Sequence, residues 1–394
     1  MIPALQNYAF TQLGITLKSK EDPAVEHYFD ALQFGETVCN MNQADLYFAR
    51  NEMLNGIGIS ELCVLPSGKY DESRFKVYRD ELIKYMPSGN ESRVSVPEGI
   101  KTIAGGAFSK IEGITVLDLP DSLEELKTCA LGFMPDLVEV NLSHDLRYAG
   151  DFITMESKIE KELDGMLVIG GWLIKCNVED EVIRIPENVV GMCCDAFDDA
   201  SKSAKEIILP PGLKEIKEET FNDFSELEKI NLPEGLQCIG AAAFSDCVSL
   251  KELVIPETVD TIENGAFQGC ESLERVRISE AVTEIGECTF VDCHALRELH
   301  LPENLRTIGA DGINAFAGCS SLQKLVFPEH LAYIGECAFQ DCEALEEIVL
   351  PESVQKIGAM AFAGCEKLKT VHLPQREIEI GENAFEGTLW EEDN

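Results

Sequence analysis

Apolar residues recur along most of the chain with a period of 23 residues. Phenylalanine occupies equivalent positions at successive spacings of 24, 23, 23, 23, 26, 23, 23 and 23 residues: Phe197, Phe221, Phe244, Phe267, Phe290, Phe316, Phe339, Phe362 and Phe385. Upstream, Phe108 begins a further unit, with Leu131 in the next phenylalanine position. A unit of this length can bury its apolar side chains only by stacking on its neighbours, so the pattern predicts a solenoid.

Each unit predicts one short strand followed by a turn. Leu253 and Ile255 alternate with outward-facing positions, which is strand periodicity, and Pro256 ends the strand because it lacks an N–H donor. A glycine precedes Ala-Phe or its equivalent in several units, where we expect a tight reversal with positive φ. These glycines are Gly240, Gly286, Gly335, Gly358 and Gly381.

The repeated unit A-F-x-x-C-x-x-L-x-x-L-x-I-P-x-x-V-x-x-I resembles the leucine-rich repeats of the BspA-like, treponemal type, from about Val94 to the C terminus. The resemblance implies a right-handed repeat solenoid, mostly β with short helical turns, and a parallel sheet on its concave side. It also implies a bacterial surface protein that binds host or bacterial surface proteins. We therefore expect a non-enzymatic, surface-adhesin-like scaffold that recognises a protein on the concave sheet face.

The location of the protein has two interpretations. The resemblance implies the cell surface or secretion. However, no basic residue precedes Lys18 and no continuous apolar core follows the N terminus, so no secretory signal is visible and a cytoplasmic location stays the alternative. No apolar run approaches the length of a membrane-spanning helix, and we expect a monomer without membrane insertion.

Residues 1–93 differ from the array, which we place at residues 94–394. They carry 9 basic and 13 acidic residues, and apolar spacings of three and four at 24–32, 43–54 and 74–86 favour amphipathic helices. We expect a mainly helical cap over the solenoid end, or a small module. The alternative function is an enzyme or small-molecule sensor in these 93 residues, with the repeats as scaffold.

Near residues 151–177, two apolar runs about Gly170-Gly171 predict a hairpin insertion.

The net charge of −39 disfavours polyanionic partners. Residues 94–394 carry 23 basic and 58 acidic residues, so most of this charge belongs to the array. We therefore expect no nucleic-acid partner. The sequence contains no H-E-x-x-H, G-x-S-x-G, P-loop or EF-hand motif, so we expect no catalytic residue, cofactor or metal.

Cysteines follow six of the phenylalanines by three residues, at Cys247, Cys270, Cys293, Cys319, Cys342 and Cys365. We interpret them as small buried apolar side chains that fill the same position in each coil, rather than as a metal or redox ladder. Cys288 and Cys337 recur five residues before two members of this column, which leaves a zinc site there as an alternative.

Three outward-facing columns are candidates for function. One alternates in sign and is interpreted as a charge ladder that fixes register: Glu206, Lys229, Glu252, Arg275, Glu298, Lys324 and Glu347. Two residues further on, a chemically varied column is the candidate ligand-binding surface, hereafter the recognition column: Asn231, Val254, Arg277, His300, Val326, Val349 and His372.

The third column forms an acidic rim after the strand-ending position: Glu234, Glu257, Glu280, Glu303, Glu329 and Glu352. We expect these carboxylates side by side with no alternating base. They form either a solvated edge that keeps solenoids from joining sideways or a functional strip for cations or a basic partner.

Overall fold

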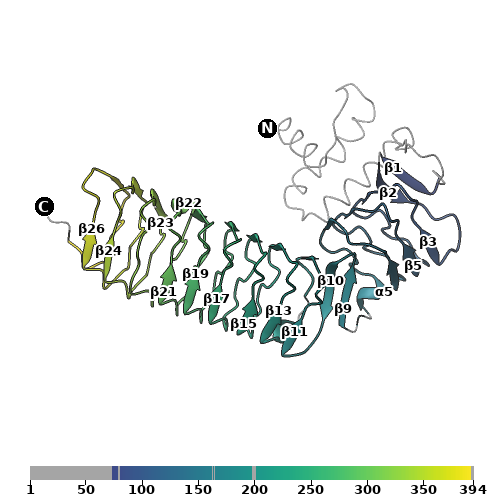
Figure 1. The fold of residues 1–394 in the computed structure, drawn as a ribbon, viewed down its shortest axis with the longest axis horizontal. Coiled ribbons are helices and arrows are strands. Elements are labelled where there is room, and N and C mark those ends of the chain that lie inside the picture. The colour runs from purple at the N-terminus through teal and green to yellow at the C-terminus, as the bar shows by residue number, and fades with distance from the viewer. Residues whose placement is uncertain (1–72, 79, 162, 164, 198–200, 392–394) are drawn as a thin grey trace, which may run out of the picture. The chain divides into compact units, whose positions relative to one another are not determined.

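The computed structural model describes residues 73–78, 80–161, 163, 165–197 and 201–391 (Figure 1). The chain divides into two units, Met1–Leu163 with Leu167–Ile174, and Asp164–Met166 with Lys175–Asn394. Both units are built from stacked coils, and the equivalent strands of successive coils pair in parallel. The predicted leucine-rich-repeat type of solenoid is thereby confirmed.

In the second unit, each coil contributes to two columns of parallel strands. The first column carries the Leu-x-Ile pattern and consists of β11 (Val182–Arg184), β13 (Glu206–Ile208), β15 (Lys229–Asn231), β17 (Glu252–Val254), β19 (Arg275–Arg277), β21 (Glu298–His300), β24 (Glu347–Val349) and β26 (Thr370–His372). The second column consists of β12 (Gly191–Met192), β14 (Glu215–Ile216), β16 (Cys238–Ile239), β18 (Thr261–Ile262), β20 (Glu284–Ile285), β22 (Thr307–Ile313), β23 (Tyr333–Glu336), β25 (Lys356–Ile357) and β27 (Glu379–Ile380). A single turn of 3-10 helix, η3 (Ser201–Ser203), precedes β13.

The strands pair in the register of the 23-residue period. Glu252 lies opposite Arg275, and Arg275 lies opposite Glu298. Between β21 and β24 the column continues through Lys324, which bridges Glu347 in parallel. The three additional residues of the 26-residue unit are accommodated in β22, which is seven residues long and pairs irregularly with β23.

The first unit has the same two columns. The first comprises β3 (Arg93–Ser95), β5 (Val116–Asp118) and β7 (Glu139–Asn141), and the second comprises β1 (Phe75–Tyr78), β2 (Glu81–Tyr85), β4 (Thr102–Ile103), β6 (Glu125–Leu126) and β8 (Tyr148–Ala149). The short helix α5 (Lys158–Lys161) follows. Strands β9 (Gly165–Ile169) and β10 (Trp172–Asn177) flank Gly170 and Gly171, which both have positive φ, and the division between the units falls within these two strands.

The prediction of a helix over residues 74–86 is wrong. This segment forms β1 and β2, which pair antiparallel, and β2 then pairs in parallel with β4. The reason is that the repeat begins earlier than expected: Tyr85 lies 23 residues before Phe108, and their rings stack with centroids 5.3 Å apart. The other predicted cap helices, and the alternative of an enzyme or sensor before this point, fall on residues 1–72, outside the described residues.

A column of phenylalanine rings forms the centre of the second unit. From Phe244 to Phe385, successive rings stack nearly parallel with centroids 5.1–5.5 Å apart. The ring of Trp390 lies edge-on to the last ring, Phe385, with the two centroids 4.6 Å apart. Leu253 and Val276, the inward residues of β17 and β19, are buried beside this column. Each coil therefore completes its core only with its neighbours, as expected for a solenoid.

The column of cysteines is buried and its thiols are free. All six side chains are inaccessible to solvent, and each Sγ donates to the carbonyl of the phenylalanine in the preceding coil, from 3.2 Å for Cys270 to 3.4 Å for Cys342. Burial raises the pKa of the Cys247 thiol to about 12, so the group stays protonated and can act as donor. The thiol thus fills a small apolar site and also satisfies a buried carbonyl.

The glycines before Ala-Phe are required for a different reason from the one predicted. None of the five has a positive φ; in these coils the left-handed residue lies two positions before phenylalanine, as at Ala242 and Met360. A Cβ built on Gly358 would lie 2.5 Å from the backbone N of Glu336, and one on Gly335 would lie 2.1 Å from the carbonyl oxygen of Gly309. The backbones of adjacent coils approach so closely here that no side chain fits.

Candidate protein-binding surface

An open hollow of about 550 Å³ lies on the outward face of the first strand column in the second unit. All three residues of β17, β19 and β21 line it, together with Arg297, Gln323, Lys324 and Val326. Because alternate residues of a strand point to opposite faces, the first and third residues of each strand project here while the second faces the core.

The hollow brings together four members of the recognition column, Val254, Arg277, His300 and Val326. The two valines are 72% and 82% exposed and lie on one face, three coils apart. Val349 and His372 continue the column beyond the hollow and lie opposite each other. The structure confirms that these positions form one column, while their role in binding stays a prediction.

Asn231 is a member of the recognition column whose side chain hydrogen-bonds to the backbone of the preceding coil. Its side-chain Oδ1 accepts a hydrogen bond from the N–H of Leu209 at 2.9 Å, and its Nδ2 donates to the carbonyl of the same residue at 3.4 Å. The amide therefore caps the backbone where the preceding strand ends. A ligand that used Asn231 would compete with these two bonds.

The charge ladder lies beside the recognition column. Lys229 Nζ contacts Glu206 at 2.8 Å, and Arg275 forms an ion pair with Glu252. Within the described residues, neither Glu298 nor Lys324 has an ion pair. The ladder is therefore a column of opposite charges in which only some neighbours are in contact.

A second charged column was not predicted. It lies one residue before the ladder and, as far as Arg297, alternates out of phase with it: Lys205, Glu228, Lys251, Glu274, Arg297, Gln323, Glu346 and Lys369. Its contacts are Lys205 with Glu181 at 2.7 Å, Lys251 with Glu228 at 3.1 Å, Arg297 with Glu274 at 3.2 Å and Lys369 with Glu346 at 3.3 Å. The sequence could have revealed this second column, because the residue before most ladder members has the opposite charge.

The acidic rim is not the row of unpaired acids that was expected. Arg277 Nη2 lies 2.9 Å from Glu257, and His300 Nε2 lies 3.8 Å from Glu280. For Glu257 and Glu280 the recognition column thus supplies the base that the rim lacks in sequence, because both basic side chains reach back to the preceding coil.

Several rim carboxylates also accept backbone hydrogen bonds from the next coil. Glu280 donates its N–H to Glu257 at 3.0 Å, Glu303 donates to Glu280 at 2.8 Å, and Gln375 donates to Glu352 at 3.1 Å. In the first unit, Asp121 donates to Glu98 in the same way. A rim carboxylate therefore caps a turn of the neighbouring coil, which the sequence pattern alone did not indicate.

In the first unit the equivalent face is polar. The guanidinium of Arg93 binds Asp118 through two hydrogen bonds of 2.6 and 2.7 Å, and Asn141 and Ser95 each donate to the same carboxylate at 3.0 Å. The bonds to Arg93, followed by those of the other two donors, lower the pKa of Asp118 to about 2. The third residues of β3, β5 and β7, which are equivalent to Val254 in β17, are the polar Ser95, Asp118 and Asn141.

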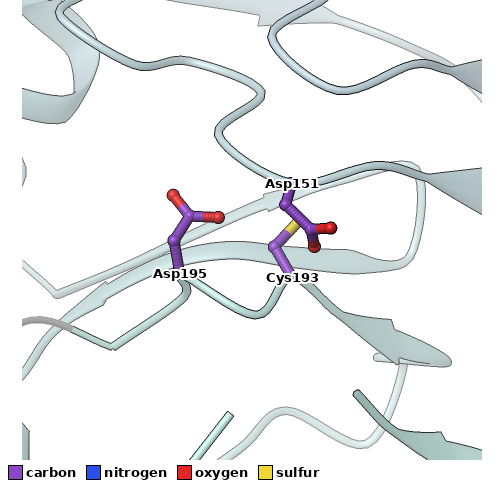
Figure 2. Close-up of side chains that lie close together, drawn as sticks. All are labelled: Asp151, Cys193 and Asp195. Carbon is purple, nitrogen blue, oxygen red and sulfur yellow. The ribbon is translucent and has the colours of Figure 1, made fainter. Parts of the chain in front are cut away.

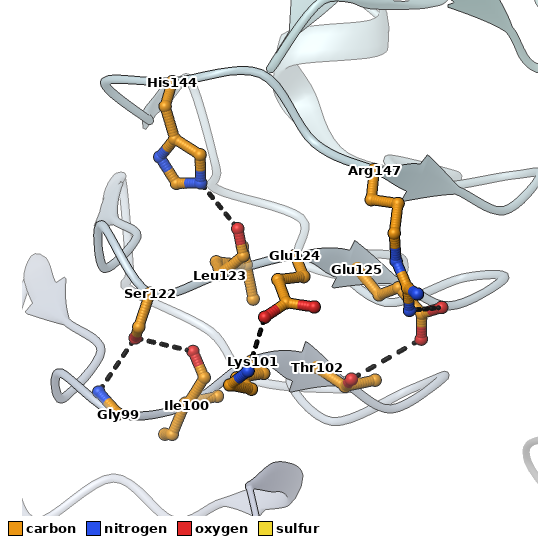
Figure 3. Close-up of polar contacts among 10 residues, drawn as sticks. All are labelled: Gly99, Ile100, Lys101, Thr102, Ser122, Leu123, Glu124, Glu125, His144 and Arg147. Atoms are coloured by element: carbon orange, nitrogen blue, oxygen red, sulfur yellow. Dashed lines mark hydrogen bonds and ion pairs between the residues drawn. The ribbon is translucent and has the colours of Figure 1, made fainter.

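Figure 3 shows similar ties between coils near the second strand column of this unit. Lys101 contacts Glu124 at 2.6 Å and Arg147 contacts Glu125 at 3.0 Å. Ser122 accepts from the N–H of Gly99 and donates to the carbonyl of Ile100, each at 2.8 Å. Paired charges between coils are therefore a general device of this solenoid, which supports the structural interpretation of the ladder.

Side chains suited to metals occur at two places in the second unit. Cys193 and Asp195 follow β12 (Figure 2), and Asp195 is 3.8 Å from Lys175 Nζ. Within the second unit these are two ligands, fewer than the four of a structural zinc site. Cys288 and Cys337 lie two coils apart, and across the described residues neither belongs to a group of three potential ligands. No metal site is assigned to either place.

Comparisons with known proteins identify the repeats. A family model described as a BspA type leucine rich repeat region matches six copies, over residues 85–162, 190–314 and 289–392. Similar solved structures include a leucine-rich repeat protein from Bacteroides ovatus, with 23% identity over 83% of this chain and 85% of that one and a TM-score of 0.46. A leucine-rich repeat protein from Eubacterium ventriosum has 19% identity over 77% and 84%, with a TM-score of 0.39.

A leucine rich cell surface protein from Faecalibacterium prausnitzii has 19% identity over 78% of this chain and 94% of that one, with a TM-score of 0.32. No curated protein matches the sequence. Across the part of the chain that the structure describes, no helix combines the length and apolar character needed to cross a membrane.

Proposed function

Because this chain belongs to the BspA-type leucine-rich repeat family, we propose that it is a non-enzymatic scaffold that binds a protein on the outward face of its first strand column. The binding surface comprises the recognition column around the hollow, from Val254 to Val326. Its location on the cell surface or in the secreted fraction, its monomeric state and an adhesin-like role toward host or bacterial proteins are parts of the same proposal, drawn from the family.

The exposure of the two valines that flank Arg277 and His300 carries this proposal. Leu253 and Val276 already fill the core beneath the sheet, so Val254 and Val326 add nothing to it. Apolar side chains left in water on a shared face reduce solubility, and a partner that covers them recovers the hydrophobic free energy. The neighbouring polar groups would then fix the orientation of that partner.

The test is the double substitution Val254→Asp with Val326→Asp. The immobilised full-length chain would be exposed to host extracellular-matrix extract and, side by side, to a bacterial lysate, and bound proteins would be identified by mass spectrometry. We expect a specific protein that the double variant loses, because two carboxylates would be buried in the contact. The thermal midpoint should change little, since both side chains are exposed.

Val190→Asp is the matched control, because Val190 is also an exposed apolar residue of the second unit but lies outside the hollow. It should retain the captured protein. If the double variant and the control bind alike, the proposed surface is wrong.

A further inference from the structure

The lining of the hollow carries more basic than acidic side chains, in a strongly acidic protein. It includes three arginines and Lys324, together with His300, against Glu252 and Glu298. Glu257 and Glu274, which pair with Arg277 and Arg297, are not part of the lining. The chain as a whole carries a net charge of −39. A basic lining in such a protein favours a ligand that presents negative charge at this position.

The basic groups retain capacity for a ligand. Arg275, Arg277 and Arg297 each have one ion pair, with Glu252, Glu257 and Glu274 respectively. A guanidinium has five N–H donors, so one carboxylate partner leaves donors free. Lys324 forms no ion pair with any residue that the structure describes. A ligand carboxylate can therefore be bound without breaking the contacts between coils.

The spacing of the recognition column defines the form of the ligand. Val254 and Val326 are three coils apart, which at about 4.8 Å per strand is roughly 14 Å. An extended peptide rises about 3.3 Å per residue and presents residues i, i+2 and i+4 on one face, so i and i+4 are about 13 Å apart. A segment running across the strands would place its two apolar residues on the valines and residue i+2 between them, over Arg277 and His300.

The overall charge limits how acidic the ligand is. A polyphosphate or a highly acidic segment would be repelled by the field of the whole chain. Glu298, within the hollow, opposes a second carboxylate on the ladder side. One acidic residue flanked by neutral positions satisfies both conditions.

We propose that the surface binds an extended protein segment with one acidic residue between two apolar residues that are four positions apart. This inference rests on the proposed function and specifies the chemistry of the partner. The apolar residues cover Val254 and Val326, and the acidic residue binds the donors of Arg277, with Lys324 beside the second apolar contact.

Random peptides displayed on phage and selected on the full-length chain would test it, with counter-selection on the Val254→Asp, Val326→Asp variant. We expect enrichment of sequences with apolar residues at i and i+4 and Asp or Glu at i+2. A synthetic peptide of this sequence should bind at least about tenfold more weakly to an Arg277→Gln, Lys324→Gln variant, since the charged contact with Arg277 and the nearby positive charge of Lys324 are lost. Lys356→Gln is the control, because Lys356 pairs with Glu379 on the second strand column and should leave binding unchanged.

Enrichment of basic peptides, of a different apolar spacing, or of no peptide at all would overturn the inference. The proposed function would still stand if a captured protein were lost from the Val254→Asp, Val326→Asp variant. Equal binding of the peptide by the Arg277→Gln, Lys324→Gln variant would contradict the acidic contact alone.

Discussion

At the scale of single residues, the glycine before Ala-Phe sets how closely coils can stack. Gly358 is the test case, because a Cβ at this position would lie 2.5 Å from backbone atoms of both Gly335 and Glu336. We expect Gly358→Ala to lower the free energy of unfolding by about 1–3 kcal/mol, as overpacked cores do. Urea denaturation followed by circular dichroism would measure it.

Gly89 provides the matched comparison, since a Cβ there would meet nothing within 4 Å. Gly89→Ala should shift the free energy of unfolding by no more than about 0.5 kcal/mol. Equal destabilisation by the two substitutions would show that the close approach of the coils is not what requires glycine.

The second prediction at this scale concerns the reactivity of the buried thiols. The six column thiols are inaccessible, and burial raises the pKa of four of them, Cys247, Cys270, Cys293 and Cys319. Cys194, Cys238 and Cys288 are half-buried. The pKa of Cys238 is raised to about 11, mainly by burial, so its thiolate is scarce at neutral pH. We expect titration with a thiol reagent to show slow, partial reaction in native buffer and full reaction in denaturant.

The same titration distinguishes packed thiols from disulfides. Prior treatment with reductant should not increase the number of reactive groups in denaturant, because all cysteines within the described residues are free. A clear increase would indicate disulfides and, with them, an oxidising compartment.

At the scale of strands, the two charged columns define the register between coils. In the observed pairing, Glu252 lies opposite Arg275, and Lys251 contacts Glu228 in the coil before it. A slip of one residue between β17 and β19 would place Lys251 opposite Arg275, or Glu252 opposite Glu274. Each surface pair contributes only about 0–1 kcal/mol, but a slipped register would replace many attractions by repulsions.

The rim also belongs to this scale, because each carboxylate joins two coils. Oxygens of Glu257 and Glu280 already accept backbone amides, and Arg277 neutralises Glu257. We therefore expect the thermal midpoint in millimolar calcium to equal that in sodium at matched ionic strength. A calcium-specific increase that disappears in the Glu257→Gln, Glu280→Gln, Glu303→Gln variant would instead favour a functional cation strip.

At the scale of the whole molecule, the sequence predicted the features that every coil shares. The period, the ring column, the buried thiols and the outward columns all follow from identical side chains in identical positions. It did not predict what depends on contacts between unlike residues of different coils, such as Arg277 with Glu257 or the rim amides. Tyr85 was missed because it replaces phenylalanine in the first described coil.

The stacking of coils has a mechanical consequence. In the second unit the backbone hydrogen bonds between coils lie along the direction in which the coils are stacked, as between Phe290 and Ala315 or Phe339 and Ala361. Tension on the chain ends would load the outermost coil first, and the others would bear it only after that coil had detached. We expect optical-tweezer traces to show successive steps of about 75 Å, the extended length of 23 residues, at similar forces. Rupture in one large step would contradict this behaviour. Under load the molecule would lengthen in stages, and this would limit the force that reaches a bound partner.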